Sequence, residues 1–452
     1  MRQFRMVSTS GILGYGYPEA SLNAALERGV DMIGCDGGSS DPGPYYLGSG
    51  KPFVSLRAMK RDLRLMLVAA IRHKVPMVIG TAGGAGGAPH LQLLAQMVRD
   101  IAHEEALHFT MALIHSEQDK ALIRQRVREG RTRPLGRRAP LDEATVDRAT
   151  RIVGMCGPEP YIRALDQGAQ VVLGGRSSDP APFAANAMRA QLPPGPAWYA
   201  GKMLECGAAP ALPKGPDCLH VIVREDGVIC EPMGDRACTP MSVANHSLHE
   251  NASPIHHIEP GGMLDTSACR FEALSPKATL VTGMQWHPAE QYTVKLEAAE
   301  LLGHRAITIC GTRDPALIGQ LDHFLDLVRQ LVHSKVADLD IAPEEYHLTI
   351  HTYGRDGVMA GREPVKEIRG HELGFVVDVV GKSAEVASAV IALSRTSMLH
   401  SDFPGRLCKE GNMAFPFSPS DLTAGEVYRF SMSHVVVPDD PYEMFPIEFE
   451  LI

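Results

Sequence analysis

The chain has 452 residues, more than one hydrophobic core usually serves, so we expect two domains. An apolar fraction of 44% and a charged fraction of 21% are ordinary for a folded protein, and the net charge of −9 argues against nucleic acid or an anionic membrane as partner. The nine cysteines lack a C-x-x-C pair, and no apolar run is long enough for a signal peptide or a membrane span, so we predict a cytoplasmic protein with reduced thiols.

The first 195 residues alternate helical periodicity with short apolar runs. Helices are predicted at 18–28, 57–74, 90–105, 116–128 and 158–167, and strands at 32–34, 77–80, 109–113 and 171–173. Strands that alternate with helices of this length are typical of βαβ units. We therefore predict an α/β domain over residues 1–195 with a doubly wound, Rossmann-like parallel sheet.

One pattern occurs twice, in residues 26–44 and 165–182. Each copy has a helical stretch that ends at a glycine, Gly29 or Gly168, then an apolar run and a loop with the sequence Ser-Ser-Asp-Pro. Glycine is the favoured residue after a last helical turn, and Asp-Pro suits the N-cap of the next helix. Both copies therefore predict helix, strand, loop and helix.

Such loops lie at the carboxyl edge of a parallel sheet, where open α/β folds bind ligands. The side chains that this edge is expected to bring together are Asp36, Ser40, Asp41, Arg176, Ser178 and Asp179. The alternative is that Ser-Asp-Pro only starts a helix in both places, and the sequence leaves it open.

Two more loops with small residues are expected at the same edge, Gly11–Pro18 and Gly80–His90. The second has four glycines, which let the backbone approach an anion closely, and the positive end of a helix follows it. These glycines are Gly83, Gly84, Gly86 and Gly87. The loop is neither a Walker loop nor a G-x-G-x-x-G motif, and a plain flexible turn remains the alternative. His90 closes it, as a base, a donor or a structural residue.

Residues 124–138 contain seven arginines. This segment is either a solvated helix end with an exposed loop or a mobile arm for a phosphate-bearing ligand, such as coenzyme A, or for a partner subunit. Nucleic acid is less favoured, because no aromatic side chains are interleaved for base stacking.

A proline-rich stretch at 191–201 predicts the domain boundary. Residues 196–452 favour an α+β domain with mostly antiparallel strands and an extended C-terminal tail, which we expect to pack on its own domain or on a second subunit. Expected strands are 220–223, 279–281, 306–310, 347–351 and 374–380, with helices near 314–333 and 383–394.

Lys202, Glu205 and Cys206 share one face of a predicted helix. Glu205 is a candidate acid or base, Cys206 a buried or reactive thiol, and Lys202 a substrate contact. The alternative for Lys202 and Glu205 is a surface ion pair of small energetic value.

A long polar loop follows at 242–272, a kind of segment that often carries function. From it we predict His249, Glu250 and Asn251 as substrate contacts. No metal site is predicted, because His256 and His257 are adjacent and should point apart, and no H-E-x-x-H motif occurs. The absence of G-x-S-x-G argues against an α/β-hydrolase.

Several of these segments resemble the acyclic terpene utilisation (AtuA-like) family. They are AGKMLECGAAP at 200–210, GAQVVLGGRSSDPAPFA at 168–184, LHENASPIHHIEPGGMLDTS at 248–267, GMQWHPAEQYTVK at 283–295 and the run 394–420. The resemblance covers most of the chain from Gly157 onward and is looser over the first 90 residues. It implies that residues 196–452 form a domain of this family's type. It also implies hydratase, lyase or isomerase chemistry on an acyl-CoA or a small carboxylic acid in a catabolic pathway, and it transfers no catalytic residue.

We therefore expect a cofactor-independent lyase, hydratase or isomerase, with coenzyme A present at most as part of the substrate. The glycine loop would hold a carboxylate or thioester oxygen, Arg176 would pair with a second anionic group, and one carboxylate would remove a proton next to the carbonyl. The candidate carboxylates are Asp36, Asp41, Asp179 and Glu205.

Two alternatives remain open: an accessory subunit of an acyl-CoA carboxylase-type complex, and an amidohydrolase that uses a bound water. A homo-dimer or higher homo-oligomer is the default assembly.

Overall fold

The computed structural model describes residues 2–248 and 252–452 and divides into two compact units. Unit 1 runs from the N-terminus to Glu300 and resumes from Phe430 to Ile452, and unit 2 comprises Leu301–Arg429. The boundary expected at 195/196 therefore does not separate the units. The proline-rich stretch there instead begins helix α9 (Pro194–Leu204), and the strands that follow extend the sheet of unit 1.

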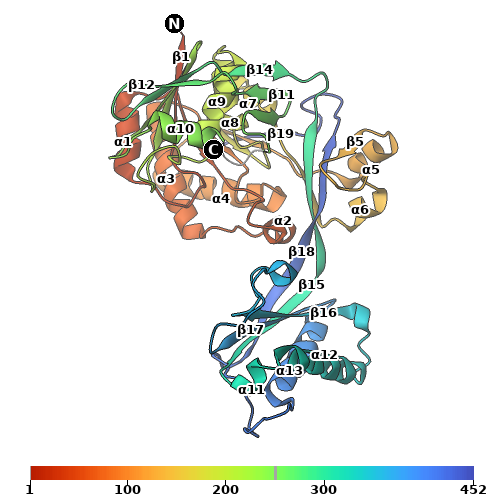
Figure 1. The fold of residues 1–452 in the computed structure, drawn as a ribbon. Helices are drawn as coiled ribbons and strands as arrows, with labels where there is room; N and C mark the ends of the chain where they lie inside the picture. Colours follow the sequence, from red (N-terminus) through yellow and green to blue (C-terminus); the bar gives the residue numbers. More distant parts are fainter. Residues whose placement is uncertain (1, 249–251) are drawn as a thin grey trace. The chain divides into compact units, whose positions relative to one another are not determined.

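Unit 1 is built on a ten-stranded sheet with the order β12-β13-β9-β8-β1-β2-β3-β7-β4-β19 (Figure 1). In that order the strands span Arg270–Ala273, Thr279–Thr282, Gly227–Pro232, Leu219–Arg224, Gln3–Ser8, Met32–Asp36, Met77–Gly80, Val171–Gly174, Thr110–Ile114 and Ile447–Leu451. The strands from β1 to β4 in this order pair in parallel, and the pairs outside them are antiparallel. The mixed α/β class with a parallel set of strands is confirmed.

Successive residues of these strands face opposite sides of the sheet, so each strand contributes to two cores. Met32 and Val78 pack in one core with helices α7, α8 and α9, whereas Ile33 and Ile79 pack in the other with α1, α3 and α4. The helices span Glu19–Arg28 (α1), Leu56–His73 (α3), Ala88–Glu105 (α4), Glu159–Asp166 (α7) and Ala181–Arg189 (α8). Each predicted strand and helix of this region is present within two residues, except that α5 (Lys120–Arg128) begins later than expected.

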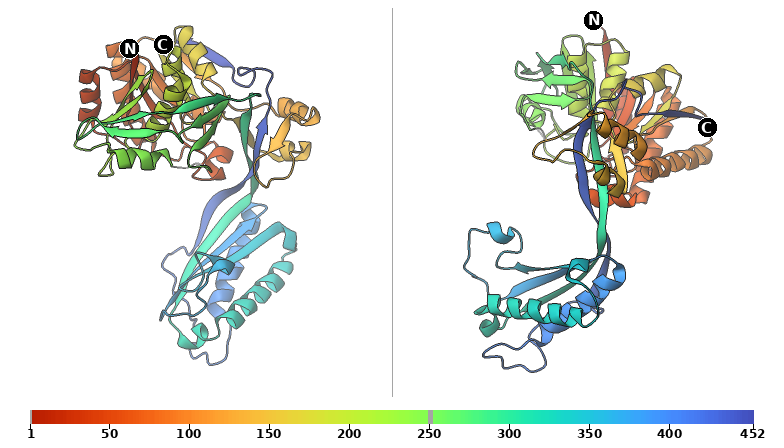
Figure 2. Two further views of the ribbon diagram at one scale, coloured as in Figure 1. Left: turned by 45° about the horizontal axis from the view of Figure 1, so that its top comes forward. Right: turned by 90° about the vertical axis from the view of Figure 1, so that its right-hand side faces the viewer.

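Unit 2 has the element order β15 (Val294–Thr312), α12 (Leu321–Ala337), β16 (Tyr346–Tyr353), β17 (Leu373–Gly381), α13 (Ala384–His400) and β18 (Asp421–Val436). The strand order β16-β17-β15-β18 makes this the ferredoxin-like βαββαβ pattern. Phe375 and Val377 of β17 pack against Phe324 of α12 and Val390 of α13, so both helices cover one face of the sheet (Figure 2). Two strands carry the chain between the units, β15 at 300/301 and β18 at 429/430.

The C-terminal tail packs on unit 1. Its last strand, β19, pairs antiparallel with β4, where Glu448 lies opposite Leu113. Among the described residues, no helix has both the length and the hydropathy needed to cross a bilayer.

Candidate functional site

The loops that follow β2, β3 and β7 meet at the carboxyl edge of the parallel strands, as the sequence predicts. The Thr81 N–H donates to the Gly175 carbonyl at 3.0 Å, and the Arg176 N–H donates to the Gly86 carbonyl at 2.9 Å. The glycine loop therefore binds directly to the second Ser-Ser-Asp-Pro loop.

Glycine is required in this region for close backbone packing. Gly86 has a φ of +68°, and a Cβ there would collide with the backbone nitrogen of Arg176. A Cβ on Gly38, in the loop after β2, would collide with the carbonyl of Gly84. Gly83 and Gly87 are closely packed as well, against the His90 backbone and the Arg151 side chain. Substrate binding by the four glycines of the loop stays a prediction. Close packing accounts for the residue type at Gly83, Gly86 and Gly87, and a φ of +130° favours glycine at Gly84.

His90 positions the glycine loop. Its Nδ1 accepts the Gly87 N–H at 3.2 Å, and its Nε2 lies 3.1 Å from the Lys51 carbonyl oxygen, to which it can only donate. Burial lowers the pKa of the ring. Because both nitrogens are bonded to backbone, His90 is held neutral as a structural residue, and the expectation of a catalytic base gains no support.

The expected helix-capping role of the Asp-Pro pairs is wrong. Helix α8 begins after Pro180 and helix α2 (Pro44–Ser49) after Gly43, and neither start has a side-chain cap. Asp41 and Asp179 are thus not used as N-caps of these helices. The glycine terminators do take positive φ, +89° at Gly29 and +91° at Gly168.

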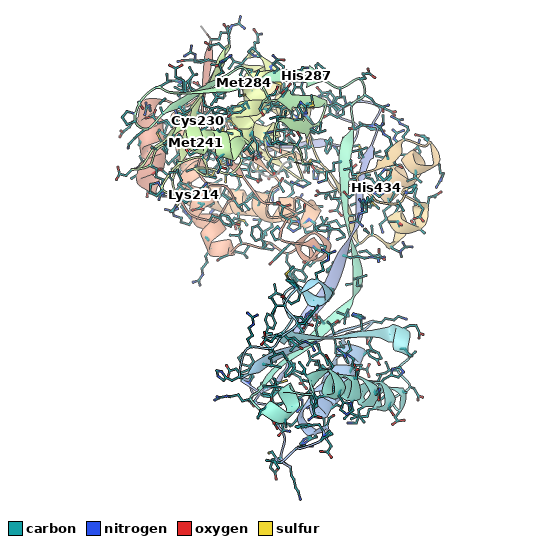
Figure 3. The ribbon with its side chains drawn as sticks, in the orientation of Figure 1. Lys214, Cys230, Met241, Met284, His287 and His434 are labelled. Atoms are coloured by element: carbon teal, nitrogen blue, oxygen red, sulfur yellow. The ribbon has the colours of Figure 1, made fainter. Side chains whose placement is uncertain are left out.

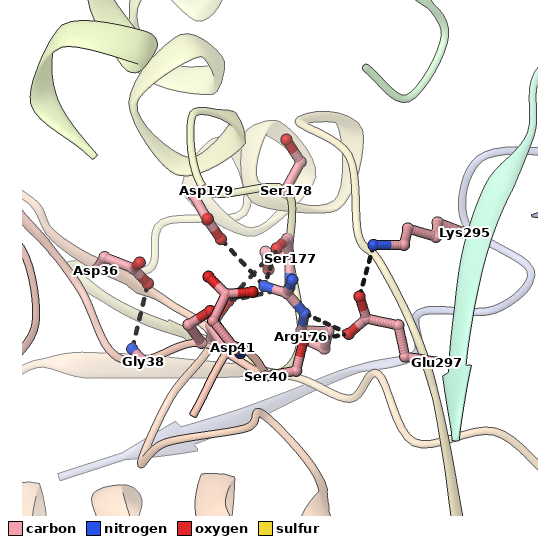
Figure 4. Close-up of polar contacts among 12 residues, drawn as sticks. Asp36, Gly38, Ser40, Asp41, Arg176, Ser177, Ser178, Asp179, Lys295 and Glu297 are labelled. Atoms are coloured by element: carbon pink, nitrogen blue, oxygen red, sulfur yellow. Dashed lines mark hydrogen bonds and ion pairs between the residues drawn. The ribbon is translucent and has the colours of Figure 1, made fainter. Parts of the chain in front are cut away.

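Arg176 is the centre of the polar cluster (Figure 4). Its Nε donates to Glu297 Oε2 at 3.0 Å, and its Nη1 donates to Asp179 Oδ1 at 3.0 Å and to the Ser177 carbonyl at 2.9 Å. The guanidinium is 5% exposed and lies between acids on two different segments. In the described part of the chain, Nη2 makes no hydrogen bond, so one nitrogen of Arg176 remains for a ligand oxygen.

The two serine–aspartate pairs have different partners. Ser40 donates to Glu297 at 2.8 Å, whereas Ser178 donates to Glu259. Asp41 is exposed, and the Asp179 side chain is 29% exposed beside Arg176. The second copy therefore holds its aspartate in the cluster, and the first holds its aspartate at the surface.

Burial and mutual repulsion make several carboxyl groups of the cluster hard to ionise. Burial, then the charge of Asp179, raises the pKa of Asp36 well above its usual range. Burial also raises the pKa of Asp179, of Glu205 to about 8 and of Glu259 to about 7, and the charge of Asp179 adds to the rise at Glu205 and Glu259. Burial acts in the same direction on Glu297, but Arg176 and Lys295 hold its pKa well below its usual range. The cluster thus combines a firmly ionised carboxylate with groups that titrate near neutrality.

Lys202 and Glu205 form a buried ion pair, with Nζ 2.6 Å from Oε1 and both side chains 6% exposed. The alternative of a surface pair is therefore wrong. Cys206 follows Glu205 in the chain and is half-buried. His246, on helix α10 (Pro240–Ser247), lies with its Nε2 3.2 Å from the Lys202 carbonyl oxygen. Ligand atoms of Glu205, Cys206 and His246 all lie within 4.8 Å of one another, the one such group of metal-ligand type in the described residues.

Two cavities border the cluster. One, of about 490 Å³, is lined by the loop after β1, including Gly11 and Tyr15, and by Cys206 and Asp217. The other, of about 320 Å³, is lined by Ser40, Asp41, Arg138, Lys295, Glu297, Phe430, Met432 and Ser433.

The arginine-rich segment is mostly engaged in ion pairs, which favours the structural interpretation. Arg126 is 5% exposed and pairs with Glu129, Asp439 and Glu443. Part of the segment forms strand β5 (Thr132–Pro134), which pairs with β18. Arg138 is an exception, because it lines the second cavity, where a ligand could bind.

His249, Glu250 and Asn251 lie outside the described residues. His256 is exposed and His257 is buried, so the adjacent histidines do point apart on strand β10 (His256–Glu259). His287 (Figure 3) is on β14 (Gln285–Pro288), in the same three-stranded sheet as β10, and its Nε2 lies 3.6 Å from Asp265 Oδ2.

The sequence interpretation missed Glu259, Lys295 and Glu297. Lys295 and Glu297 alternate along β15 and so lie on one face of the strand, where Nζ is 2.7 Å from Oε1. The alternation is visible in the sequence, but nothing local indicates that this strand contacts Arg176.

Comparison with protein families gives a match over residues 57–210 to the profile described as acyclic terpene utilisation family protein AtuA. This segment is therefore similar to the AtuA family. The AtuA segment includes nearly all of α3, the glycine loop, Arg176, Asp179 and Glu205, and thus part of the cluster. It lies earlier in the chain than the resemblance suggested, within unit 1. Comparison with curated proteins gave no match, and comparison with solved structures gave none either.

Proposed function

We propose that the protein is an enzyme of the lyase, hydratase or isomerase type that transfers a proton on a small carboxylic acid or its coenzyme A thioester. The observation that carries the proposal is a pair of partly exposed carboxyl groups. Asp179 pairs with the buried charge of Arg176, and Glu259 accepts a hydrogen bond from Ser178, next to Asp179 in the chain. An acid and a base of different proton affinity in one site are what removal and return of a proton next to a carbonyl require.

The cavity of about 320 Å³ supports a small anionic substrate. Arg138 and Lys295 offer positive charge to a carboxylate, and Ser40 offers a hydroxyl. The volume is at the low end of ligand sites, about 300–1,000 Å³, so it suits an acid or an acyl group. The coenzyme A part of a thioester would extend outside the cavity.

The first test is a thermal-shift screen of small di- and tricarboxylates and acyl-CoAs. A ligand at a hundred times its Kd adds about 2.7 kcal/mol of stability, which a melting curve resolves. Arg138→Ala should reduce the shift, because it removes a cation from the cavity without touching the Arg176 cluster.

The second test is deuterium uptake from D₂O at the α-carbon of the stabilising ligand, followed by NMR. Asp179→Asn and Glu259→Gln should each slow the exchange at least ~10²-fold, while the ligand still raises the Tm. The matched control is Asp226→Asn, which changes a half-exposed carboxylate paired with Arg224. Full exchange in Asp41→Asn, Asp179→Asn, Glu205→Gln and Glu259→Gln alike would exclude carboxyl-mediated proton transfer.

A further inference from the structure

We infer that Glu205, Cys206 and His246 form a binding site for one zinc ion. Their three ligand atoms lie within 4.8 Å of one another. Ligand atoms around a tetrahedral zinc ion are about 3–4 Å apart, so small side-chain movements complete the geometry. Carboxylate oxygen, thiolate sulfur and imidazole nitrogen are the three donor types that zinc takes in proteins.

The hydrogen bond of His246 has the form found at metal-bound histidines. A carbonyl oxygen can only accept, so the contact of Nε2 with Lys202 at 3.2 Å places the proton on Nε2. In the neutral ring, Nδ1 then carries the lone pair that binds a metal. Ligating histidines usually donate their other N–H in this manner, which fixes the tautomer and the ring orientation.

The surroundings favour a cation. Lys202 bonds to one oxygen of Glu205, and the carboxylate has a second oxygen for the ion. Asp179 and Glu259 lie near Glu205, and each adds negative charge there when it is ionised. Three protein ligands leave a fourth position of a tetrahedral ion open, and Cys206 lines the cavity of about 490 Å³. The site therefore has the composition of a zinc centre with access for a water or a ligand.

The inference does not depend on the proposed function, and it replaces the sequence-based expectation that no metal binds. That expectation relied on spacing within one segment. Here the ligands come from the end of α9 and from α10, which pack against each other.

The test is metal binding by the full-length chain after removal of metals with a chelator. Co²⁺ titration should produce the intense near-ultraviolet band of a thiolate-bound cobalt ion, saturating at one equivalent, and Zn²⁺ should displace it. Cys206→Ser should abolish the band. His246→Gln should weaken Zn²⁺ binding by at least ~10-fold, since loss of even an outer partner typically weakens binding 10–100-fold.

The control is Cys408→Ser, which removes an exposed thiol of unit 2 and should change neither the band nor the stoichiometry. Thermal unfolding of each metal-free variant is compared with that of the metal-free wild type, so that a folding defect is not mistaken for loss of a ligand. Absence of the band in the wild type, or its persistence in Cys206→Ser, would overturn the inference.

Discussion

Arg176 is one of two cations that keep the Glu297 carboxyl group ionised. It bonds to Glu297 and Asp179 from within the protein, where a charge without a partner is strongly unfavourable. Glu297 has a second cation in Lys295 and is held ionised, whereas Glu259 contacts the hydroxyl of Ser178 and titrates near neutrality. Glu297 and Glu259 have the same side chain, and their different partners therefore give them different protonation states.

Replacing Arg176 should destabilise the fold far more than replacing a surface arginine. Arg176→Ala leaves Glu297 and Asp179 without this partner and should lower the free energy of unfolding by ~3–5 kcal/mol. The control is Arg189→Ala, because Arg189 pairs with Asp166 while both side chains are largely exposed, and its effect should stay below ~1 kcal/mol. Urea unfolding measures both, and equal losses would refute a buried, stabilising Arg176.

The Glu259 carboxyl should make stability depend on pH. Ser178, Asp179 and Lys202 face it, and burial raises its pKa to about 7, above ~4.3 in an unfolded chain. The folded state therefore prefers the protonated form of Glu259. Its contribution to the free energy of unfolding is present in full below pH ~4.3 and is lost as the pH rises through 7.

The Glu259→Gln variant stays neutral at every pH. Relative to it, the free energy of unfolding of the wild type should fall by ~1–2 kcal/mol between pH 5 and pH 8. Urea unfolding at several pH values gives the difference, with the exposed Glu290→Gln as control. A constant difference across this range would show that Glu259 is ionised throughout.

At the scale of elements, the site depends on loops that pack without side chains between them. The glycine loop after β3 contacts the loops after β2 and β7 through backbone atoms. This packing brings Asp36, at the end of β2, close to Arg176 and Asp179, which both follow β7.

Two glycines with nearly equal φ distinguish packing from backbone strain. Gly86 has φ +68° and would collide with Arg176, whereas Gly136 has φ +64° and nothing within 4 Å of its Cβ position. Gly136→Ala should lower the free energy of unfolding by only ~1–2 kcal/mol, the strain of positive φ. Gly86→Ala should lower it by at least ~3 kcal/mol, because the backbone must also move. Chemical denaturation compares the two variants. Similar losses of unfolding free energy would show that close backbone packing at Gly86 adds nothing to the strain of positive φ.

At the scale of the molecule, each unit has its own hydrophobic core. The cores that contain Phe183 and Val7 consist of unit 1 residues, and the core that contains Phe375 consists of unit 2 residues. The described part of the polar cluster lies in unit 1. Unit 2 is therefore expected to unfold separately from the site.

Calorimetry should resolve two transitions. Phe375→Ala removes a fully buried ring and should lower the free energy of unfolding of unit 2 by ~3–5 kcal/mol. The transition temperature of unit 2 should therefore fall, while that of unit 1 stays unchanged. Phe183→Ala, also fully buried, should do the reverse. A single transition that both substitutions shift equally would mean that the chain unfolds as one cooperative unit.

Local patterns in the sequence were sufficient to predict the parallel α/β region and the meeting of the loops after β2, β3 and β7 at one edge of the sheet. Helical and strand periodicity depend on neighbouring residues, and parallel strands place their carboxyl ends together whatever the rest of the chain does. Only the tertiary structure revealed Glu259 and Glu297, the burial of Lys202 and Glu205, the grouping of Cys206 with His246, and the division of the chain at 300/301 and 429/430. These features arise where segments far apart in sequence pack together, and burial there decides both partner and protonation state.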